Sequence, residues 1–265
     1  MLTVNGLGFR YKGREILRDI SFSINRGEIV SVIGPNGAGK STLLRCILRI
    51  FLATEGSVTI DGEDTFLMGV TRRSQRLSYV PQGGHFPRPH MTVFDVVIMG
   101  RRSYSTAWQP TEEDVDKTIT ALDAFNIDPM RDFSELSGCE RQRVLFARAL
   151  VQEANYMLLD EPASNLDPRR QFEVMESLKA AASERQTGVL IVVHDLNLAY
   201  RFSDQVVMLH NGRLISKGPA GSVMSKKNIN AVYGVETKKV GCGGFRHLVS
   251  VGLAAGETPG VKTGG

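Results

Sequence analysis

The sequence predicts an α/β fold in which a parallel sheet forms the core, an antiparallel β layer comes first, and an α-helical subdomain is inserted. Three observations support this prediction. Residues 27–34 (GEIVSVIG) are almost continuously apolar, as expected of a strand that is buried on both faces. Residues 1–25 instead alternate apolar and polar side chains, which is typical of strands with one solvated face. The stretch from about Thr92 to Ala154 has helical periodicity and contains no buried type of strand.

The composition is that of an ordinary globular protein, and it disfavours nucleic-acid-binding, membrane-spanning, secreted and disulfide-rich proteins. Hydrophobic residues are 42% and charged residues 23% of the 265 positions, and a net charge of +4 is too mild to predict a nucleic-acid partner. No apolar run approaches the roughly 18 residues that cross a bilayer, and the N-terminus lacks a signal-peptide layout, so we expect a cytoplasmic chain. Cys46, Cys139 and Cys242 are scattered, which predicts neither a disulfide framework nor a zinc site.

The N-terminal β layer is predicted from its first two strands, residues 2–11 and 16–24, which a turn at Lys12 and Gly13 separates. Residues 56–62 (GSVTIDG) form a further short strand. The buried strand at 27–34 leads directly into a helix, residues 40–51, whose apolar side chains recur every three or four positions.

Two more strands of the buried type are predicted at residues 156–160 and 188–193. A hairpin over residues 205–218, with its turn at Asn211 and Gly212, closes the sheet. We therefore expect one domain over residues 1–235. Residues 236–265 form a Gly-rich extension that is expected to be poorly ordered at its end.

The sequence GPNGAGKST matches the phosphate-binding pattern G-x-x-x-x-G-K-[ST] and lies between a strand and a helix, as a P-loop NTPase core requires. Its glycines allow backbone N–H groups to point at phosphate oxygens. Lys40 supplies charge to the β- and γ-phosphates, and the Ser41 hydroxyl can reach Mg²⁺. The predicted nucleotide-binding residues of this loop are Gly34, Pro35, Asn36, Gly37, Ala38, Gly39, Lys40, Ser41 and Thr42.

The strand at residues 156–160 ends in two carboxylates, Asp160 and Glu161. Consecutive residues at a strand end point to opposite sides, so the two cannot do the same work. Asp160 suits the surroundings of the magnesium ion, and Glu161 could polarise a water molecule for attack on the γ-phosphate. The alternative is a pair of solvated acids. The phosphate-binding loop and the two carboxylates predict an NTP-binding protein, but they do not distinguish a kinase from a motor protein.

A second anion site is suggested by the stretch FSELSGCERQR, residues 133–143. Ser137 and Gly138 stand at the start of an Arg-rich helical pattern. A serine cap on a surface helix would explain them, and so would an anion bound at the helix N-terminus, where unpaired N–H groups meet the positive end of the dipole.

The segment LSGCERQR resembles the signature of ABC-type ATPases, which is usually LSGGQ or LSGGE followed by Gln-Arg. Other landmarks of that family follow in the expected order, and the resemblance extends from Leu2 to about Tyr233. These landmarks are Tyr11 as the adenine-stacking aromatic residue, Gln82 as the Q-loop glutamine, Asp167 in the D-loop segment SNLD, and His194 as the switch histidine. The resemblance implies the ABC ATPase fold.

Members of this family work as head-to-tail homodimers that enclose two Mg·ATP, each between the P-loop of one subunit and the signature helix of the other. By resemblance, Ser137, Gly138 and Cys139 would then contact the nucleotide of the partner subunit. Gln82 would sense Mg²⁺ and the membrane partner, while His194 would hold the γ-phosphate and the attacking water. The catalytic residues that the resemblance implies are Glu161, His194 and Gln82, and the implied metal-site residues are Ser41, Gln82 and Asp160. The resemblance also implies two further nucleotide-binding residues, Tyr11 and Asp167.

One departure from the family pattern is Cys139, which stands where glycine is usual. A side chain there adds bulk beside the phosphate and can restrict φ. It is either a tolerated variant or a residue that weakens ATP-driven closure or makes it redox-sensitive.

Among ABC proteins, the transporter class is favoured. The chain between Thr42 and Asp160 is too short for the long coiled coils of the DNA-repair type, and one cassette without a basic linker disfavours the translation-factor type. Residues 91–104, 194–204, 211–220 and 228–236 resemble importers of iron–siderophore complexes, haem and cobalamin; molybdate or tungstate importers are the alternative. Exporters are disfavoured because they usually fuse the cassette to a membrane domain.

The resemblance also implies the partners and the location. The implied partners are a second ATPase subunit, polytopic permease subunits and, indirectly, a substrate-binding protein, and no nucleic acid is expected. The implied location is the cytoplasmic face of the inner membrane. The pair Arg101 and Arg102 is either solvated or in contact with a permease.

Overall fold

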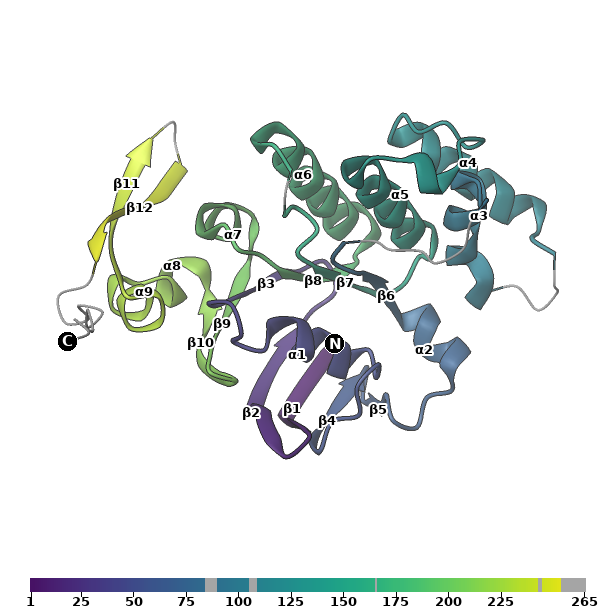
Figure 1. Cartoon of the computed structure of the whole chain (residues 1–265). Coiled ribbons are helices and arrows are strands. Elements are labelled where there is room, and N and C mark those ends of the chain that lie inside the picture. The colour runs from purple at the N-terminus through teal and green to yellow at the C-terminus, as the bar shows by residue number, and fades with distance from the viewer. Residues whose placement is uncertain (84–89, 105–108, 165, 243–244, 254–265) are drawn as a thin grey trace, which may run out of the picture.

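The computed structural model describes residues 1–83, 90–104, 109–164, 166–242 and 245–253, and its core is a six-stranded sheet (Figure 1). The strand order is β10-β9-β3-β8-β7-β6, and all neighbours are parallel except the hairpin of β9 and β10. The strands are β3 (Ile29–Ile33), β6 (Leu77–Val80), β7 (Tyr156–Asp160), β8 (Gly188–Val192), β9 (Gln205–His210) and β10 (Arg213–Pro219).

Both faces of this sheet are buried, as the apolar runs predict. In β3, Val30 and Val32 face one cluster of buried side chains, and Ile29 and Ile33 face the other. The first cluster lies between the core sheet and a four-stranded antiparallel sheet with helix α1 (Lys40–Ile47). That second sheet has the order β2-β1-β4-β5, from β1 (Leu2–Tyr11), β2 (Arg14–Ile24), β4 (Glu55–Ile60) and β5 (Glu63–Asp64).

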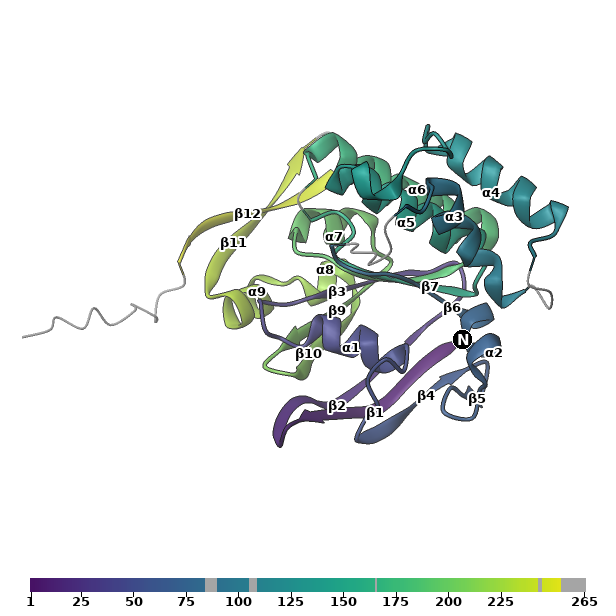
Figure 2. The ribbon, with the colours of Figure 1, turned by 45° about the vertical axis from the view of Figure 1, so that its right-hand side comes forward.

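The other face of the core sheet is covered by helices, as Figures 1 and 2 both show. The inserted helical subdomain supplies α3, α4 and α5, and α6 to α9 complete the layer. The helices are α2 (Val70–Arg76), α3 (Val93–Ile98), α4 (Glu112–Ala124), α5 (Gly138–Val151), α6 (Pro168–Arg185), α7 (Leu196–Phe202), α8 (Ala220–Val223) and α9 (Lys226–Tyr233), with short 3₁₀ helices η1 (Met99–Ser103) and η2 (Phe133–Glu135). None of the helices in the described part of the chain is long and apolar enough to cross a membrane.

The predicted fold class is confirmed, and β6 and the C-terminal hairpin are among the elements that the sequence analysis did not predict. Strand β6 was not predicted, because four residues with a buried serine in the second position carry no periodic signal. The C-terminal extension contains an unpredicted hairpin of β11 (Val235–Cys242) and β12 (Phe245–Leu253), which stands at the edge of the molecule (Figure 2). Asn197 in α7 ties it down, since its side chain exchanges hydrogen bonds of 2.7 and 3.2 Å with the backbone of Leu248. The end of the extension, residues 254–265, lies outside the described residues.

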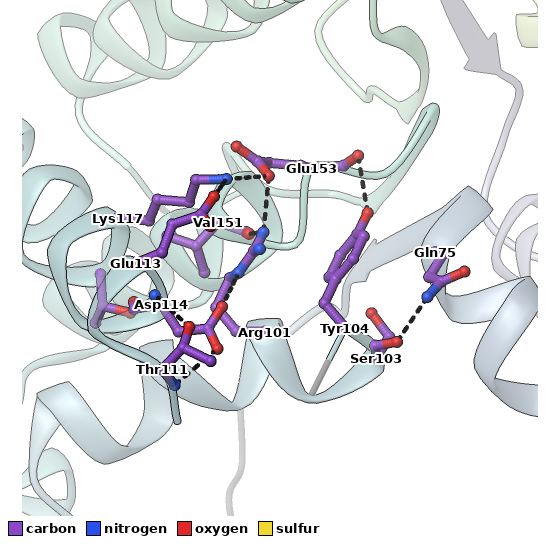
Figure 3. A network of polar contacts seen from close by, with 11 residues as sticks. Gln75, Arg101, Ser103, Tyr104, Thr111, Glu113, Asp114, Lys117, Val151 and Glu153 are labelled. Carbon is purple, nitrogen blue, oxygen red and sulfur yellow. Dashed lines mark hydrogen bonds and ion pairs between the residues drawn. The ribbon is translucent and has the colours of Figure 1, made fainter. Parts of the chain in front are cut away.

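Both interpretations of Arg101 from sequence were wrong, because its side chain is buried inside the helical subdomain (Figure 3). Its guanidinium bonds the carboxylates of Asp114 and Glu153 and the backbone oxygen of Val151, each at 2.8 Å. The preceding Gly100 lets η1 lie against α5, since a Cβ there would be 2.4 Å from the backbone oxygen of Arg148. The Gly-Arg pair therefore joins η1, α4 and the end of α5, whereas Arg102 is exposed.

Candidate active site

Six of the nine predicted phosphate-loop residues and the predicted catalytic side chains line one open cleft of about 810 Å³, whereas Gly34, Pro35 and Ala38 do not line it. The cleft lies at the carboxyl ends of parallel strands β3, β7 and β8, where ligands of α/β sheets bind. Its lining residues are Arg14, Ile16, Asn36, Gly37, Gly39, Lys40, Ser41, Thr42, Gln82, Glu161, Ser164 and His194.

The phosphate loop begins at Gly34, directly after β3, and its conformation requires glycine at that point. Gly34 has φ of 152°, and a Cβ on it would be 2.3 Å from the backbone oxygen of Leu209 in the neighbouring strand β9. Since a non-bonded approach of that kind is forbidden, any other residue would push the loop away from the sheet. The loop then leads into α1, so the free N–H groups of the first turn face the cleft.

Lys40 lies over the loop that it follows. Its Nζ donates hydrogen bonds of 2.8 Å and 3.0 Å to the backbone oxygens of Gly34 and Pro35, and the residue is only 5% exposed. Burial lowers the pKa of the Lys40 ammonium, while the nearby carboxylates of Glu161 and Asp160 act in the opposite direction. Phosphate oxygens are therefore well suited to replace the two carbonyls as partners of this ammonium.

Ser41 and Asp160 form the candidate magnesium site. The Ser41 hydroxyl donates a hydrogen bond of 2.8 Å to Oδ1 of Asp160, which is fully buried at the end of β7. Burial raises the pKa of the Asp160 carboxyl, and the bond from Ser41 counteracts part of that effect. A hydroxyl and a carboxylate side by side next to the phosphate loop are the oxygen donors that Mg²⁺ takes in nucleotide sites, so the residues fit the ion.

Glu161, Gln82 and His194 come together from three different loops. Gln82 Nε2 donates a 2.6 Å hydrogen bond to Oε2 of Glu161, and Nε2 of His194 contacts Oε1 of the same carboxylate. Glu161 itself has φ of 53°, an uncommon conformation for a residue with a side chain. Because such strain persists only where the surroundings hold it, this turn is typical of a functional position.

The other predicted nucleotide-binding residues lie outside this cleft in the single chain. Tyr11 is 57% exposed at the end of β1, opposite Arg14 of β2, which does line the cleft. Asp167 is exposed and caps α6, where its side chain accepts a bond of 3.1 Å from the N–H of Arg170. Ser137 caps α5, so the capping interpretation of this serine is observed.

The cap on α5 is a reciprocal one. The Ser137 hydroxyl donates a 2.7 Å bond to Glu140 and accepts from the Glu140 N–H at 3.3 Å, while Glu140 also pairs with Arg131 at 2.6 Å. These bonds, that of Ser137 first, lower the pKa of Glu140 to about 2. The N–H groups of Gly138 and Cys139 lie in the same first turn and take no bond from this cap. A cap and an anion site are therefore compatible.

Ser164, the first residue of the segment SNLD, lines the cleft although it was not among the predicted site residues. Sequence reasoning also missed Arg14 and Ile16, which line the same cleft. Neither belongs to a motif, and the pairing of β1 with β2 brings them to the phosphate loop. No sequence signal marks them, because their position depends on contact between the antiparallel sheet and α1.

Comparison with known proteins adds independent information. Residues 17–164 match the sequence profile of the family described as ABC transporter. An uncharacterized ABC transporter ATP-binding protein of Methanocaldococcus jannaschii is 40% identical over 254 residues, which span 95% of this chain and 98% of that protein. The hemin import ATP-binding protein of Pseudomonas fluorescens is 37% identical over 241 residues, 89% of this chain and 93% of that protein. The cobalamin import ATP-binding protein of Halobacterium salinarum is 38% identical over 235 residues, 88% of this chain and 58% of that protein.

Solved structures are similar over most of the chain. A metal-chelate type ABC transporter in an inward-facing conformation superimposes with a TM-score of 0.81 at 29% identity, over 94% of this chain and 97% of the other. A dimeric ATP-binding cassette in a post-hydrolysis state with ADP and Pi has a TM-score of 0.75 at 26% identity, over 83% of this chain and 99% of the other.

Proposed function

The chain belongs to the ABC transporter family as an ATP-binding subunit. We propose that it serves an importer, as its relatives' names indicate, and that the cargo is a metal chelate such as an iron–siderophore, haem or cobalamin. The observation that carries this proposal is the similarity to the metal-chelate type transporter, because it extends over 94% of the chain and so must include part of residues 236–265. The hemin and cobalamin relatives support the same cargo class. Phosphonate import ATP-binding proteins at 37% and 35% identity make phosphonates the competing cargo.

We further propose that two copies associate head to tail around two nucleotides. The signature residues Ser137, Gly138 and Cys139 lie on α5 and line none of their own chain's nucleotide cleft. In such a dimer, the first turn of α5 would complete the cleft of the partner with N–H groups and the positive end of a helix dipole. The dimeric cassette among the similar structures is consistent with this arrangement.

The side chains of the cleft divide the work of hydrolysis. Lys40 and the loop N–H groups bind and orient the phosphates. Ser41 and Asp160 would hold Mg²⁺, which supplies charge neutralisation to the phosphate oxygens when bound. The Glu161 carboxylate accepts a proton from the attacking water, and its contacts with Gln82 and His194 fix its orientation. Closing and reopening of the dimer with each hydrolysis cycle would drive the permease between its states.

The cargo and the partners can be tested by purifying the tagged chain from gently solubilised membranes of its own cells and identifying what co-purifies by mass spectrometry. We expect a polytopic permease, which would place the chain at the cytoplasmic face of the membrane. ATP hydrolysis by that complex should rise with a metal chelate on its binding protein and not with a phosphonate. Stimulation by phosphonate alone would overturn the cargo, and capture of soluble proteins or nucleic acid alone would overturn the proposed complex.

A further inference from the structure

The C-terminal hairpin of β11 and β12 is attached to the helix that follows His194. Asn197, in the first turn of α7, donates a 3.2 Å hydrogen bond from its side-chain nitrogen to the backbone oxygen of Leu248 in β12. Its side-chain oxygen accepts a 2.7 Å bond from the N–H of the same leucine. One amide therefore satisfies both backbone groups of Leu248, as a neighbouring strand would. The two bonds together fix the position of the hairpin relative to α7.

Apolar packing surrounds this polar contact. The Leu248 side chain is 7% exposed and belongs to the same buried cluster as Leu198 and Ala199 of α7. Lys239, the partner of Leu248 in β11, has its Nζ 5.7 Å from the centre of the Tyr200 ring in α7. A helix of this length is not stable in isolation, so contacts with neighbouring elements decide where α7 lies.

His194 lies between two fixed points of the chain and belongs to no helix or strand. Before it, the N–H of Val193 donates a 3.2 Å bond to the backbone oxygen of Val32 in β3. After it, the Asp195 carboxylate caps α7 and accepts a 2.7 Å bond from the N–H of Asn197. Asn197 therefore takes part in the second fixed point with its backbone, while its side chain holds the hairpin.

The direction of the His194 side chain matters for the chemistry of the cleft. Its Nε2 contacts Oε1 of Glu161, the carboxylate that can activate water. The His194 side chain is 42% exposed, so packing contributes less to its orientation than the backbone that carries it. Since a misplacement of about 1 Å can lower a rate by about 10²-fold, the segments on both sides of His194 affect hydrolysis.

The segment that leads into the hairpin also contacts the phosphate loop. Tyr233 ends α9 two residues before β11, and the backbone of Gly34 forms a hydrogen bond with its hydroxyl. Burial raises the pKa of Tyr233 to about 12, and the bond from Gly34 acts against this rise. The C-terminal part of the chain thus contacts the start of the phosphate loop as well as α7.

We propose that Asn197 is a positioning residue of ATP hydrolysis: its bonds to the C-terminal hairpin hold the start of α7 in place and thereby direct His194 at the carboxylate of Glu161. The hairpin is then part of the hydrolytic apparatus, although neither Asn197 nor Leu248 lines the nucleotide cleft. This inference rests on the roles that the proposed function gives to Glu161 and His194.

The test measures ATP hydrolysis and ATP binding by the full chain. Asn197→Ala removes both bonds to Leu248, so we expect kcat to fall by at least ~10-fold. The Kd of ATP should change by less than about 2-fold, since the groups that hold the phosphates are untouched. Asn197→Asp keeps an acceptor for the Leu248 N–H, so its kcat should lie between those of the wild type and Asn197→Ala. An unchanged kcat in Asn197→Ala would overturn the inference.

The matched control is Asn228→Ala. Asn228 of α9 is half-buried like Asn197, and its side-chain nitrogen donates a 2.8 Å bond to the backbone oxygen of Val223 in α8. The control therefore removes a bond of the same kind from the C-terminal part of the chain, and it should leave kcat unchanged. Equal losses in the two variants would show that any damage to C-terminal packing lowers the rate, which contradicts a positioning role of Asn197.

A double-mutant cycle shows whether Asn197 acts through His194. If it does, Asn197→Ala should lower kcat far less in a His194→Ala background than in the wild type, because the group that it positions is already absent. Additive losses would contradict the inference. An impaired His194→Ala beside an unimpaired Asn197→Ala would overturn the inference alone. An unimpaired His194→Ala would instead overturn the role of His194 in the proposed function, and the inference with it.

Discussion

The side-chain amide of Gln82 donates a 2.6 Å hydrogen bond to the carboxylate of Glu161, although 79 positions of sequence separate the two residues. Gln82 follows strand β6 and Glu161 follows strand β7, which is its neighbour in the sheet. The contact therefore connects the entrance of the helical subdomain to the group that can activate water. Any displacement of that subdomain relative to the sheet would change the surroundings of the Glu161 carboxylate.

Replacing the Glu161 carboxylate with an amide should separate nucleotide binding from hydrolysis. Glu161→Gln keeps the size of the side chain but removes the proton acceptor, so we expect turnover to fall by at least ~10²-fold while ATP still binds. ATPase rates and ATP titrations measure the two effects, and light scattering should detect a trapped dimer. Glu176→Gln makes the same change at an exposed position of α6 and should have no effect. Normal turnover in Glu161→Gln would exclude Glu161 as the base.

Removing the Lys40 ammonium should weaken binding itself. Since a hydrogen bond to a charged group contributes about 1.5–3 kcal/mol, Lys40→Ala should raise the Kd of ATP by roughly tenfold to a hundredfold. Fluorescent nucleotide titration provides the measurement. Lys179→Ala, on the exposed side of α6, is the matched control. An unchanged Kd in Lys40→Ala would contradict the assignment of the phosphate loop.

The Arg101 network should dominate the stability of the helical subdomain. Arg101→Gln would leave the carboxylate of Asp114, which is only 4% exposed, without its cationic partner. Removing one member of a buried ion pair costs about 3–5 kcal/mol, so denaturant unfolding should show a loss of that order. Arg102→Gln changes the exposed neighbour and should change the free energy of unfolding by less than about 0.5 kcal/mol. Similar losses for the two variants would contradict the buried network.

The cap of α5 should make part of the stability depend on acid pH. The folded pKa of Glu140, about 2, lies below its ordinary value of 4.5. A group with a depressed folded pKa stabilises the protein above its unfolded pKa, and this contribution disappears as the pH falls from about 4.5 to about 2. Glu140→Gln should therefore lower the free energy of unfolding at pH 7, and its difference from wild type should shrink between pH 5 and pH 2. A difference that does not vary with pH would show that the carboxylate charge has no part in the cap.

The fold class and most of the site were predictable because they depend on local sequence. A phosphate loop needs glycines and a lysine at fixed spacing between one strand and the next helix, so GPNGAGKST can be recognised from the sequence alone. Apolar runs identify β3, β7 and β8 as buried strands for the same reason. The signature and switch residues were found by resemblance to a family, and their chemical roles were inferred from the same resemblance.

The tertiary structure decided what local sequence cannot express. Arg101 and Arg102 are adjacent and chemically identical, yet one is buried among carboxylates and the other is exposed, because the partners come from α4 and the end of α5. Strand β6 exists because β7 offers it a parallel edge, and Arg14 reaches the cleft because the antiparallel sheet packs against α1. The sequence by itself determined which chemical groups are available, since each motif is a short-range pattern. Their distances, burial and charge balance depend on contacts between distant segments, and only folding establishes those contacts.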